Sequence, residues 1–241
     1  MKNILKIALF TAGLLFVSCK EEIEKPKVSY EKPSKNTTKI KTDTTQITVA
    51  DLPINIEGTK YLLFPIGDLN IYGSNSKSLY SSSSSDSDVR FTMSNYNDFQ
   101  LTGYLQNLKF QEIGKDSITK LTKKQVLIQT VTYLKSIADK NKQQYLVYTL
   151  ADMDTNKDDK LDTNDIKSLY ISEISGNNFV KLSTDFQELL DWNLIELSNK
   201  LYFRTIEDIN KNGEFDKKDV VHYYFVNLLE KELKSIEFKP V

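Results

Sequence analysis

Two stretches of this chain place oxygen-bearing side chains at the spacing of a calcium-binding loop. The stretch 208–219 has such side chains at its first, third, fifth, ninth and twelfth positions, with Gly213 at the sixth. A calcium ion takes about six to eight oxygen ligands, and a tight turn with oxygens on alternating residues supplies them. The expected ligands, of which the seventh-position residue acts through its backbone carbonyl, are Asp208, Asn210, Asn212, Glu214, Asp216 and Asp219.

The same pattern occurs earlier, over residues 154–165, with Asp159 in place of the glycine. Glycine adopts positive φ freely at such a turn, and aspartate is one of the few other residues that tolerates it. The apolar residues at the eighth positions, Leu161 and Phe215, are expected to anchor the loops to the core. The expected ligands of this first loop, again with a seventh-position carbonyl, are Asp154, Asn156, Asp158, Lys160, Asp162 and Asp165.

Both stretches could instead be solvated turns, because Asp and Asn side chains commonly satisfy their own backbone in such clusters. The repetition of one spacing favours calcium. A frame that starts at Asp152 fits less well, because it puts Asp159 at the apolar position. Each loop ends in Asp and not in Glu, and the shorter carboxylate is less able to bind through both oxygens. We therefore expect two structural calcium sites with dissociation constants of about 10⁻⁴–10⁻³ M.

The composition indicates one globular domain and gives little support for catalysis. The chain has 241 residues, a net charge of −1 and 39% hydrophobic residues, so no charge excess points to nucleic acid. It lacks a nucleophile elbow, a phosphate-binding loop and a dinucleotide fingerprint. Its one histidine, His222, is expected to have a structural role or to be exposed at the surface, and not to act in catalysis. A pair of carboxylates acting as in glycosidases stays open as an alternative, because 33 acidic residues offer many pairs.

The N-terminus has the features of an export signal. Lys2 and Lys6 precede an apolar run over 7–17, which is too short to span a bilayer. The run leads to Cys19, the only cysteine, and the sequence there resembles a bacterial lipobox although Phe16 stands where Leu is usual. This resemblance implies a signal peptide over 1–18 and a lipid, such as palmitate, on Cys19. The alternative is an ordinary secretory peptide with an incidental cysteine.

The residues after the cysteine suggest where the protein is sent. Lys20-Glu21-Glu22 resembles the short tag that takes lipoproteins of Bacteroidetes-type bacteria to the outer face of the outer membrane. Residues 19–50 are polar, with few large apolar side chains, and are expected to form a disordered tether. The folded domain is expected over 51–241.

Short apolar and β-branched segments predict that this domain is all-β. The serine-rich stretch 74–88 is expected to be a loop. The stretch 125–138 has apolar residues at the spacing of one helix face, but its β-branched content is typical of a strand. We favour the strand. A short helical turn is expected at 185–190, capped by Ser183. The remaining expected strands are 61–66, 89–94, 107–113, 145–150, 169–174, 192–197, 201–206, 220–228 and 232–238. Both acidic loops therefore join two antiparallel strands, unlike an EF-hand, which joins two helices.

An internal repeat suggests how these strands are grouped. Residues 107–122 align with 168–183, and strands that begin near Phe91, Tyr145 and Tyr202 recur every 54 to 57 residues. The stretch 169–182 resembles the repeat of TolB-type propellers, and the two loops resemble the calcium loops of integrin α-subunit propellers. The resemblance implies a propeller-like array of four-stranded units, three clear ones with 51–88 as a degenerate fourth, or an open stack of sheets.

The leading hypothesis is a calcium-binding, lipid-anchored surface protein that acts as a non-enzymatic binding or assembly module. Its partners would be the membrane, reached through the lipid, and a protein or a glycan. The alternatives are a calcium-stabilised hydrolase acting on glycans and a periplasmic scaffold similar to TolB.

Overall fold

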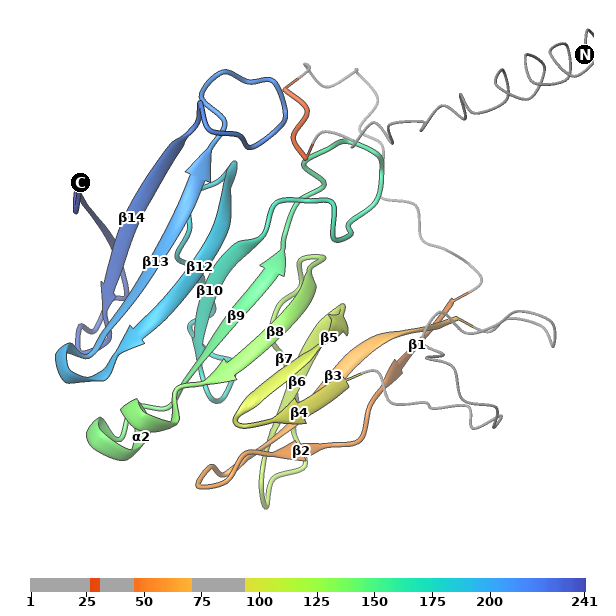
Figure 1. The fold of residues 1–241 in the computed structure, drawn as a ribbon. Helices are drawn as coiled ribbons and strands as arrows, with labels where there is room; N and C mark the ends of the chain where they lie inside the picture. The colour runs from red at the N-terminus through yellow and green to blue at the C-terminus, as the bar shows by residue number, and fades with distance from the viewer. Residues whose placement is uncertain (1–26, 31–45, 71–93) are drawn as a thin grey trace, which may run out of the picture.

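In the part of the chain that the structure describes, three antiparallel sheets form the body of the protein, and none of them closes into a barrel. The computed structural model describes residues 27–30, 46–70 and 94–241. The sheets stand side by side, with the six-stranded sheet in the middle (Figure 1). The prediction of an all-β domain is confirmed.

The first sheet, sheet A, contains a central pair of strands, β3 (Tyr61–Asn70) and β6 (Asn107–Glu112). β3 pairs on its other side with β1 and with the two-residue β2, and β6 pairs with β7. Pro65 is tolerated within β3 because it lies between the residues paired with β2 and those paired with β1. The bounds of the outer strands are β1 (Gln46–Ala50), β2 (Ile54–Asn55) and β7 (Ile118–Lys120).

The middle sheet, sheet B, has the strand order β11-β10-β9-β8-β5-β4. Its last four strands along the chain form an antiparallel meander, in which each strand pairs with the next. A single helix, α2 (Lys135–Asn141), joins β8 to β9. The strands are β4 (Ser94–Asn97), β5 (Gln100–Leu105), β8 (Leu127–Tyr133), β9 (Tyr145–Ala151), β10 (Ser168–Glu173) and β11 (Val180–Lys181).

The third sheet, sheet C, is a second four-stranded meander with the order β12-β13-β14-β15. A short 3-10 helix, η1 (Glu196–Ser198), lies between its first two strands. The strands are β12 (Gln187–Ile195), β13 (Lys200–Glu207), β14 (Val220–Asn227) and β15 (Ser235–Phe238).

Strand β9 explains why sheet B lies between the other two. Its alternate residues Leu146, Tyr148 and Leu150 belong to a hydrophobic cluster shared with sheet A. Val147, on the opposite face of the strand, belongs to a second cluster shared with sheet C. Successive side chains of a strand point to opposite faces, so a strand that is apolar on both faces must be covered on both. Full burial of each such side chain contributes about 1.5–3 kcal/mol.

The grouping of strands into units is only partly as the sequence predicted. The units expected to begin near Tyr145 and Tyr202 belong to the meanders of sheets B and C. The first unit is not a unit in the structure, because β4 and β5 join sheet B whereas β6 and β7 join sheet A. Phe91, from which that unit was expected to begin, lies outside the described residues.

The internal repeat corresponds to two equivalent hairpins. The β6–β7 hairpin pairs Lys109 with Lys120, and the β10–β11 hairpin pairs the aligned Tyr170 with Lys181. Each hairpin is extended by one backbone hydrogen bond, from Leu121 to Leu108 at 2.9 Å and from Leu182 to Leu169 at 2.8 Å.

Other local predictions had mixed outcomes. The strand favoured within 125–138 is confirmed as β8, but α2 follows it immediately and was not predicted. The helical turn expected at 185–190 is wrong, because β12 begins at Gln187 and buries Leu189 against sheet B. The domain was expected to start at residue 51, whereas β1 already begins at Gln46. The loop expected at 74–88 and most of the strand expected at 89–94 lie outside the described residues.

Candidate functional site: two acidic hairpin loops

The two acidic loops occupy equivalent places in two equivalent sheets. Loop one (154–165) connects β9 to β10, and loop two (208–219) connects β13 to β14. Both strand pairs are antiparallel, so the predicted hairpin context is confirmed. In each meander the loop joins the second strand to the third, and the two loops lie at the same end of the molecule (Figure 1).

The first aspartate of each loop organises the turn by accepting two backbone amides. In loop two, Asp208 accepts hydrogen bonds from the amides of Asn212 at 3.2 Å and Gly213 at 2.7 Å. Asp208 is 2% exposed. In loop one, Asp154 accepts the amides at the same fifth and sixth positions, at 3.2 Å and 2.9 Å.

The third, fifth and ninth positions of the two loops also match. In each case the side-chain oxygen accepts the backbone amide two residues further on. In loop one the three distances are 3.0, 3.0 and 2.8 Å. In loop two they are 2.9, 2.9 and 2.7 Å. The residues that accept these bonds are Asn156, Asp158, Asp162, Asn210, Asn212 and Asp216.

The twelfth positions close the loops but differ in their second oxygen. Asp165 Oδ2 accepts the amide of Asp162 at 2.9 Å, and Asp219 Oδ2 accepts the amide of Asp216 at 2.8 Å. Asp165 Oδ1 also accepts the amide of Thr155 at 2.7 Å. The buried Oδ1 of Asp219 has no hydrogen-bond partner among the described residues. Burial raises the pKa of Asp165 above its ordinary value, although its backbone hydrogen bonds oppose the shift.

The sixth position takes a left-handed conformation in both loops, as predicted. Gly213 has φ of 88° and Asp159 has φ of 65°. The fourth positions, Lys157 and Lys211, are also left-handed, with φ of 59° and 57°. The two loops therefore fold the same way at both positions, although their residues differ at the sixth.

The prediction that apolar residues anchor the two loops to the core is wrong. Leu161 and Phe215 are half-buried and belong to neither hydrophobic cluster of the described residues. The buried residues of the loops are polar ones, chiefly Thr155, Asp165 and Asp208. The loops are therefore held by hydrogen bonds between side chains and backbone, and not by a buried apolar side chain.

The donor set suits a hard cation in its chemistry and order, because it consists of carboxylates, amide oxygens and backbone carbonyls. The carboxylates are turned toward backbone amides of their own loop. Within the described residues, no group of three or more His, Cys, Asp or Glu side chains is arranged to hold a metal ion. The carbonyls of Lys160 and Glu214 are the seventh-position donors that the pattern predicts.

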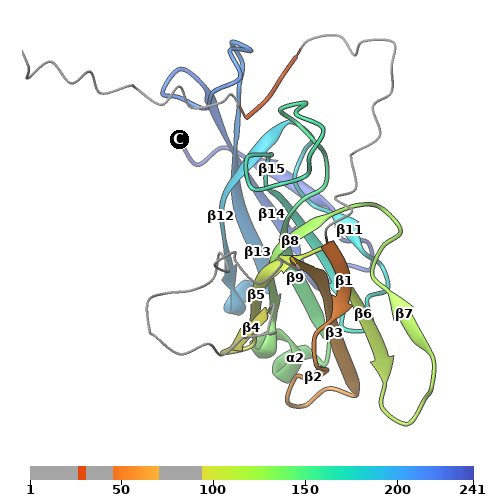
Figure 2. The same ribbon diagram turned by 90° about the vertical axis from the view of Figure 1, so that its right-hand side faces the viewer.

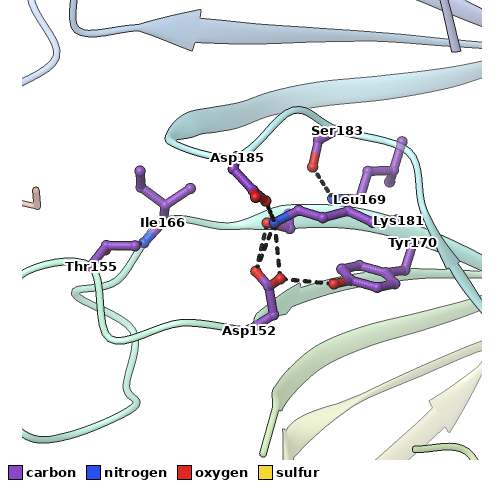
Figure 3. Close-up of polar contacts among 9 residues, drawn as sticks. Asp152, Thr155, Ile166, Leu169, Tyr170, Lys181, Ser183 and Asp185 are labelled. Carbon is purple, nitrogen blue, oxygen red and sulfur yellow. Dashed lines mark hydrogen bonds and ion pairs between the residues drawn. The ribbon is translucent and has the colours of Figure 1, made fainter. Parts of the chain in front are cut away.

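A half-buried ion-pair cluster at the base of loop one was not predicted. Asp152 accepts hydrogen bonds from Lys181 Nζ at 2.9 and 3.1 Å and from the hydroxyl of Tyr170 at 2.8 Å (Figure 3). Lys181 also pairs with Asp185 at 2.6 Å. Asp152 thus ties the end of β9 to β10 and β11. Its carboxylate is committed to this cluster, which agrees with a loop frame that starts at Asp154.

His222 lies between two carboxylates of the neighbouring strands. Its Nδ1 lies 2.8 Å from Glu237 and its Nε2 lies 3.0 Å from Glu207. These contacts join β13, β14 and β15 across sheet C.

The face of sheet C that points away from sheet B carries a cluster of aromatic rings. Tyr202 lies 5.7 Å from Phe238 and 5.8 Å from Phe225, and Tyr223 lies 6.1 Å from Phe238, between ring centroids. The Arg204–Asp191 ion pair lies beside them. Within this pair, Arg204 Nε donates a hydrogen bond of 2.8 Å to Asp191. A shallow pocket of about 300 Å³ is lined by this ion pair, by Asn193 and by three of the rings, Tyr202, Tyr223 and Phe238.

Tyr30 borders loop two although it is remote in sequence. Burial raises the pKa of Tyr30 to about 12, and the charge of Asp208 and a hydrogen bond to it add to the shift. The phenol is therefore protonated at neutral pH and can donate to the buried carboxylate. The only sequence signal for this contact is that Val28 and Tyr30 are apolar or aromatic residues in a polar stretch.

No protein-family model, no curated protein and no solved structure matches this chain. Cys19 and the predicted signal peptide lie outside the described residues. Within the described part of the chain, no helix is both long and apolar enough to cross a membrane.

Proposed function

We propose that this chain is a calcium-stabilised, lipid-anchored envelope protein that acts as a non-enzymatic binding or assembly module. One observation carries the calcium role. The two loops, at equivalent hairpins of two sheets, use the same ligand-type residues to accept the same backbone amides. A solvated turn also forms hydrogen bonds of this kind, so the support for calcium is that both loops repeat them at the same first, third, fifth, ninth and twelfth positions.

The role assigned to the ion is structural. Each loop gathers several carboxylates, whose mutual repulsion opposes closure of the hairpin at neutral pH. A divalent ion would reverse that repulsion, and ligand binding to the folded state stabilises it by mass action. At about 10 mM calcium, dissociation constants of 10⁻⁴–10⁻³ M correspond to about 1.4–2.7 kcal/mol per site.

Thermal unfolding of the chain from residue 20 onward tests this role. The midpoint should rise when chelator is replaced by calcium, and it should rise less with magnesium, which prefers a rigid octahedral site. Equal midpoints in calcium and chelator would remove the calcium role. The lipid anchor is tested separately, because Cys19→Ser should abolish the incorporation of labelled palmitate in a bacterial host.

The propeller-like interpretation is part of this proposal. Its support is that sheets B and C each contain a four-stranded meander and that their faces pack together through a shared hydrophobic cluster. Sheet A would be a rearranged unit built partly from residues 46–70.

Digestion of intact cells with protease distinguishes a surface module from a periplasmic scaffold, since the outer membrane protects a periplasmic protein from protease.

The aromatic face of sheet C favours a glycan as the partner. The half-buried rings offer flat apolar surfaces, and the neighbouring ion pair and amide offer directional hydrogen bonds, which is the composition of small-molecule sites. Tyr223→Ala should weaken binding to soluble glycans. Tyr104→Ala is the matched control, because Tyr104 is an exposed tyrosine on β5 of sheet B.

A further inference from the structure

Residues Lys27–Tyr30, here called the strap, cross both acidic loops from a position far away in the sequence. The amide of Val28 donates to the carbonyl of Gly213 in loop two at 3.3 Å. The next amide, that of Ser29, donates to the carbonyl of Thr155 in loop one at 2.8 Å. In Figures 1 and 2 the strap is the short red segment beside the two loops.

The strap is packed and not merely adjacent. Val28 is 2% exposed. The hydroxyl of Thr155 donates a hydrogen bond to the carbonyl of Lys27 at 2.8 Å. The same hydroxyl accepts a hydrogen bond from the amide of Ile166 at 3.0 Å. Thr155 therefore connects the strap to the end of loop one.

The side chains of the strap extend the contact to β12 and loop two. Lys27 Nζ lies 3.0 Å from Glu188, a carboxylate that is 5% exposed and also pairs with Lys167 at 3.1 Å. The ring of Tyr30 lies near that of Phe186. The ammonium nitrogen of Lys211 lies over the Tyr30 ring, 5.9 Å from its centroid. A charge that is this buried needs its partners, so the strap contributes to the electrostatics of sheet C as well.

We propose that the two loops form one receptor surface for the strap, and that calcium binding and strap docking strengthen each other. This inference rests on the calcium role proposed above. The carbonyls that receive the strap belong to the second position of loop one and the sixth position of loop two. A loop ordered by an ion holds its carbonyl in place for the strap, and a docked strap holds the loop closed for the ion. Such coupling is reciprocal by necessity.

Docking also changes how far the domain can stand from its anchor. The covalent path from Cys19 to Lys27 is 27 − 19 = 8 residues, whereas the path to the first residue of β1, Gln46, is 46 − 19 = 27 residues. Fully extended, these lengths are about 26–29 Å and about 89–97 Å. Calcium would thus hold the domain close to the membrane, and its removal would release the domain.

The test compares two substitutions at Ser29 in the full chain, purified in detergent. Ser29→Pro removes the amide that donates to Thr155, and Ser29→Ala keeps it. Calorimetric titration with calcium should show two sites in the wild type and in Ser29→Ala. In Ser29→Pro the affinity should fall by about fivefold or more. In addition, calcium should slow tryptic cleavage after Lys27 in Ser29→Ala but not in Ser29→Pro.

The outcomes separate the two proposals. If calcium binds and both Ser29 variants have the same affinity and the same cleavage rates, the coupling is wrong and the calcium role stands. If no variant takes up calcium, the calcium role itself fails and the coupling fails with it. Circular dichroism of each variant in chelator checks that the sheets remain folded.

Discussion

Gly176 lies directly against the ring of Phe110, so closely that a β-carbon at Gly176 would come within 2.4 Å of the ring edge. Phe110 belongs to β6 of sheet A, and Gly176 belongs to the turn between β10 and β11 of sheet B. The contact therefore limits how closely sheet A and sheet B can pack at this point. Gly176 also has φ of 81°, a conformation that favours glycine.

Gly176→Ala should lower the free energy of unfolding by about 2–4 kcal/mol. About 1 kcal/mol comes from the left-handed backbone and the rest from overpacking against a buried ring. Gly114→Ala is the matched control, because it has φ of 87° and nothing within 4 Å of its β-carbon. It should cost only the backbone part. Urea unfolding of both variants measures the difference, and equal losses would contradict the packing argument.

Asp216→Asn should reduce calcium-dependent stabilisation, whereas Glu214→Gln should not. Both changes remove one negative charge from loop two, but only Asp216 offers its side chain to the ion, since Glu214 is expected to act through its carbonyl. At about 10 mM calcium, Asp216→Asn should lose about 1.4–2.7 kcal/mol of the stabilisation and loop one should retain its share.

The measurement is the midpoint of thermal unfolding in calcium and in chelator for both variants. A loss of the same size in Glu214→Gln would mean that calcium only screens the charge of the loop.

Lys181→Met should destabilise the protein by about 3 kcal/mol. The side chains of Lys181 and Asp152 are only 18% and 12% exposed, so removal of the cation leaves a poorly solvated carboxylate. The double variant Asp152→Asn with Lys181→Met should recover part of the loss, because the only carboxylate then left without Lys181 is Asp185, whose side chain is 63% exposed. A double-mutant cycle from urea unfolding measures this, and additive losses would show that the two side chains are not coupled.

The Asp191–Arg204 pair should contribute to stability at neutral pH and lose that contribution in acid. A hydrogen bond from Arg204 lowers the pKa of Asp191 below its ordinary value of 3.8, against an opposing effect of burial. The folded state therefore binds the proton less readily than the unfolded state. The contribution is complete above the ordinary value and is lost as pH falls through the lower, folded pKa.

Both side chains are about half exposed, so solvent screens the pair and its contribution should be only about 0.2–1 kcal/mol. The stability difference between wild type and Asp191→Asn should shrink between about pH 6 and pH 2.5. A difference that is constant over that range would exclude the pair as its source. Added salt should also reduce the difference at neutral pH.

The local chemistry of the loops could be predicted from sequence because it is written in neighbouring residues. The spacing of Asp and Asn residues singled out the side chains that organise each loop, although it predicted them as calcium ligands and not as acceptors of backbone amides. The left-handed conformation at Gly213 and Asp159 followed from residue type. Alternating apolar residues likewise predicted most strands. The helix α2 was missed because its short apolar pattern continues directly from that of β8.

The sequence alone determined an all-β chain with two matched acidic hairpins, because hydrophobic periodicity and turn chemistry are local. Only the tertiary structure decided that β6 and β7 leave their neighbours for sheet A, and that Val28 and Ser29 bind both loops. Those choices depend on which apolar faces can be buried together and which carbonyls come within reach. Such long-range contacts leave little mark on the spacing of residues along the chain.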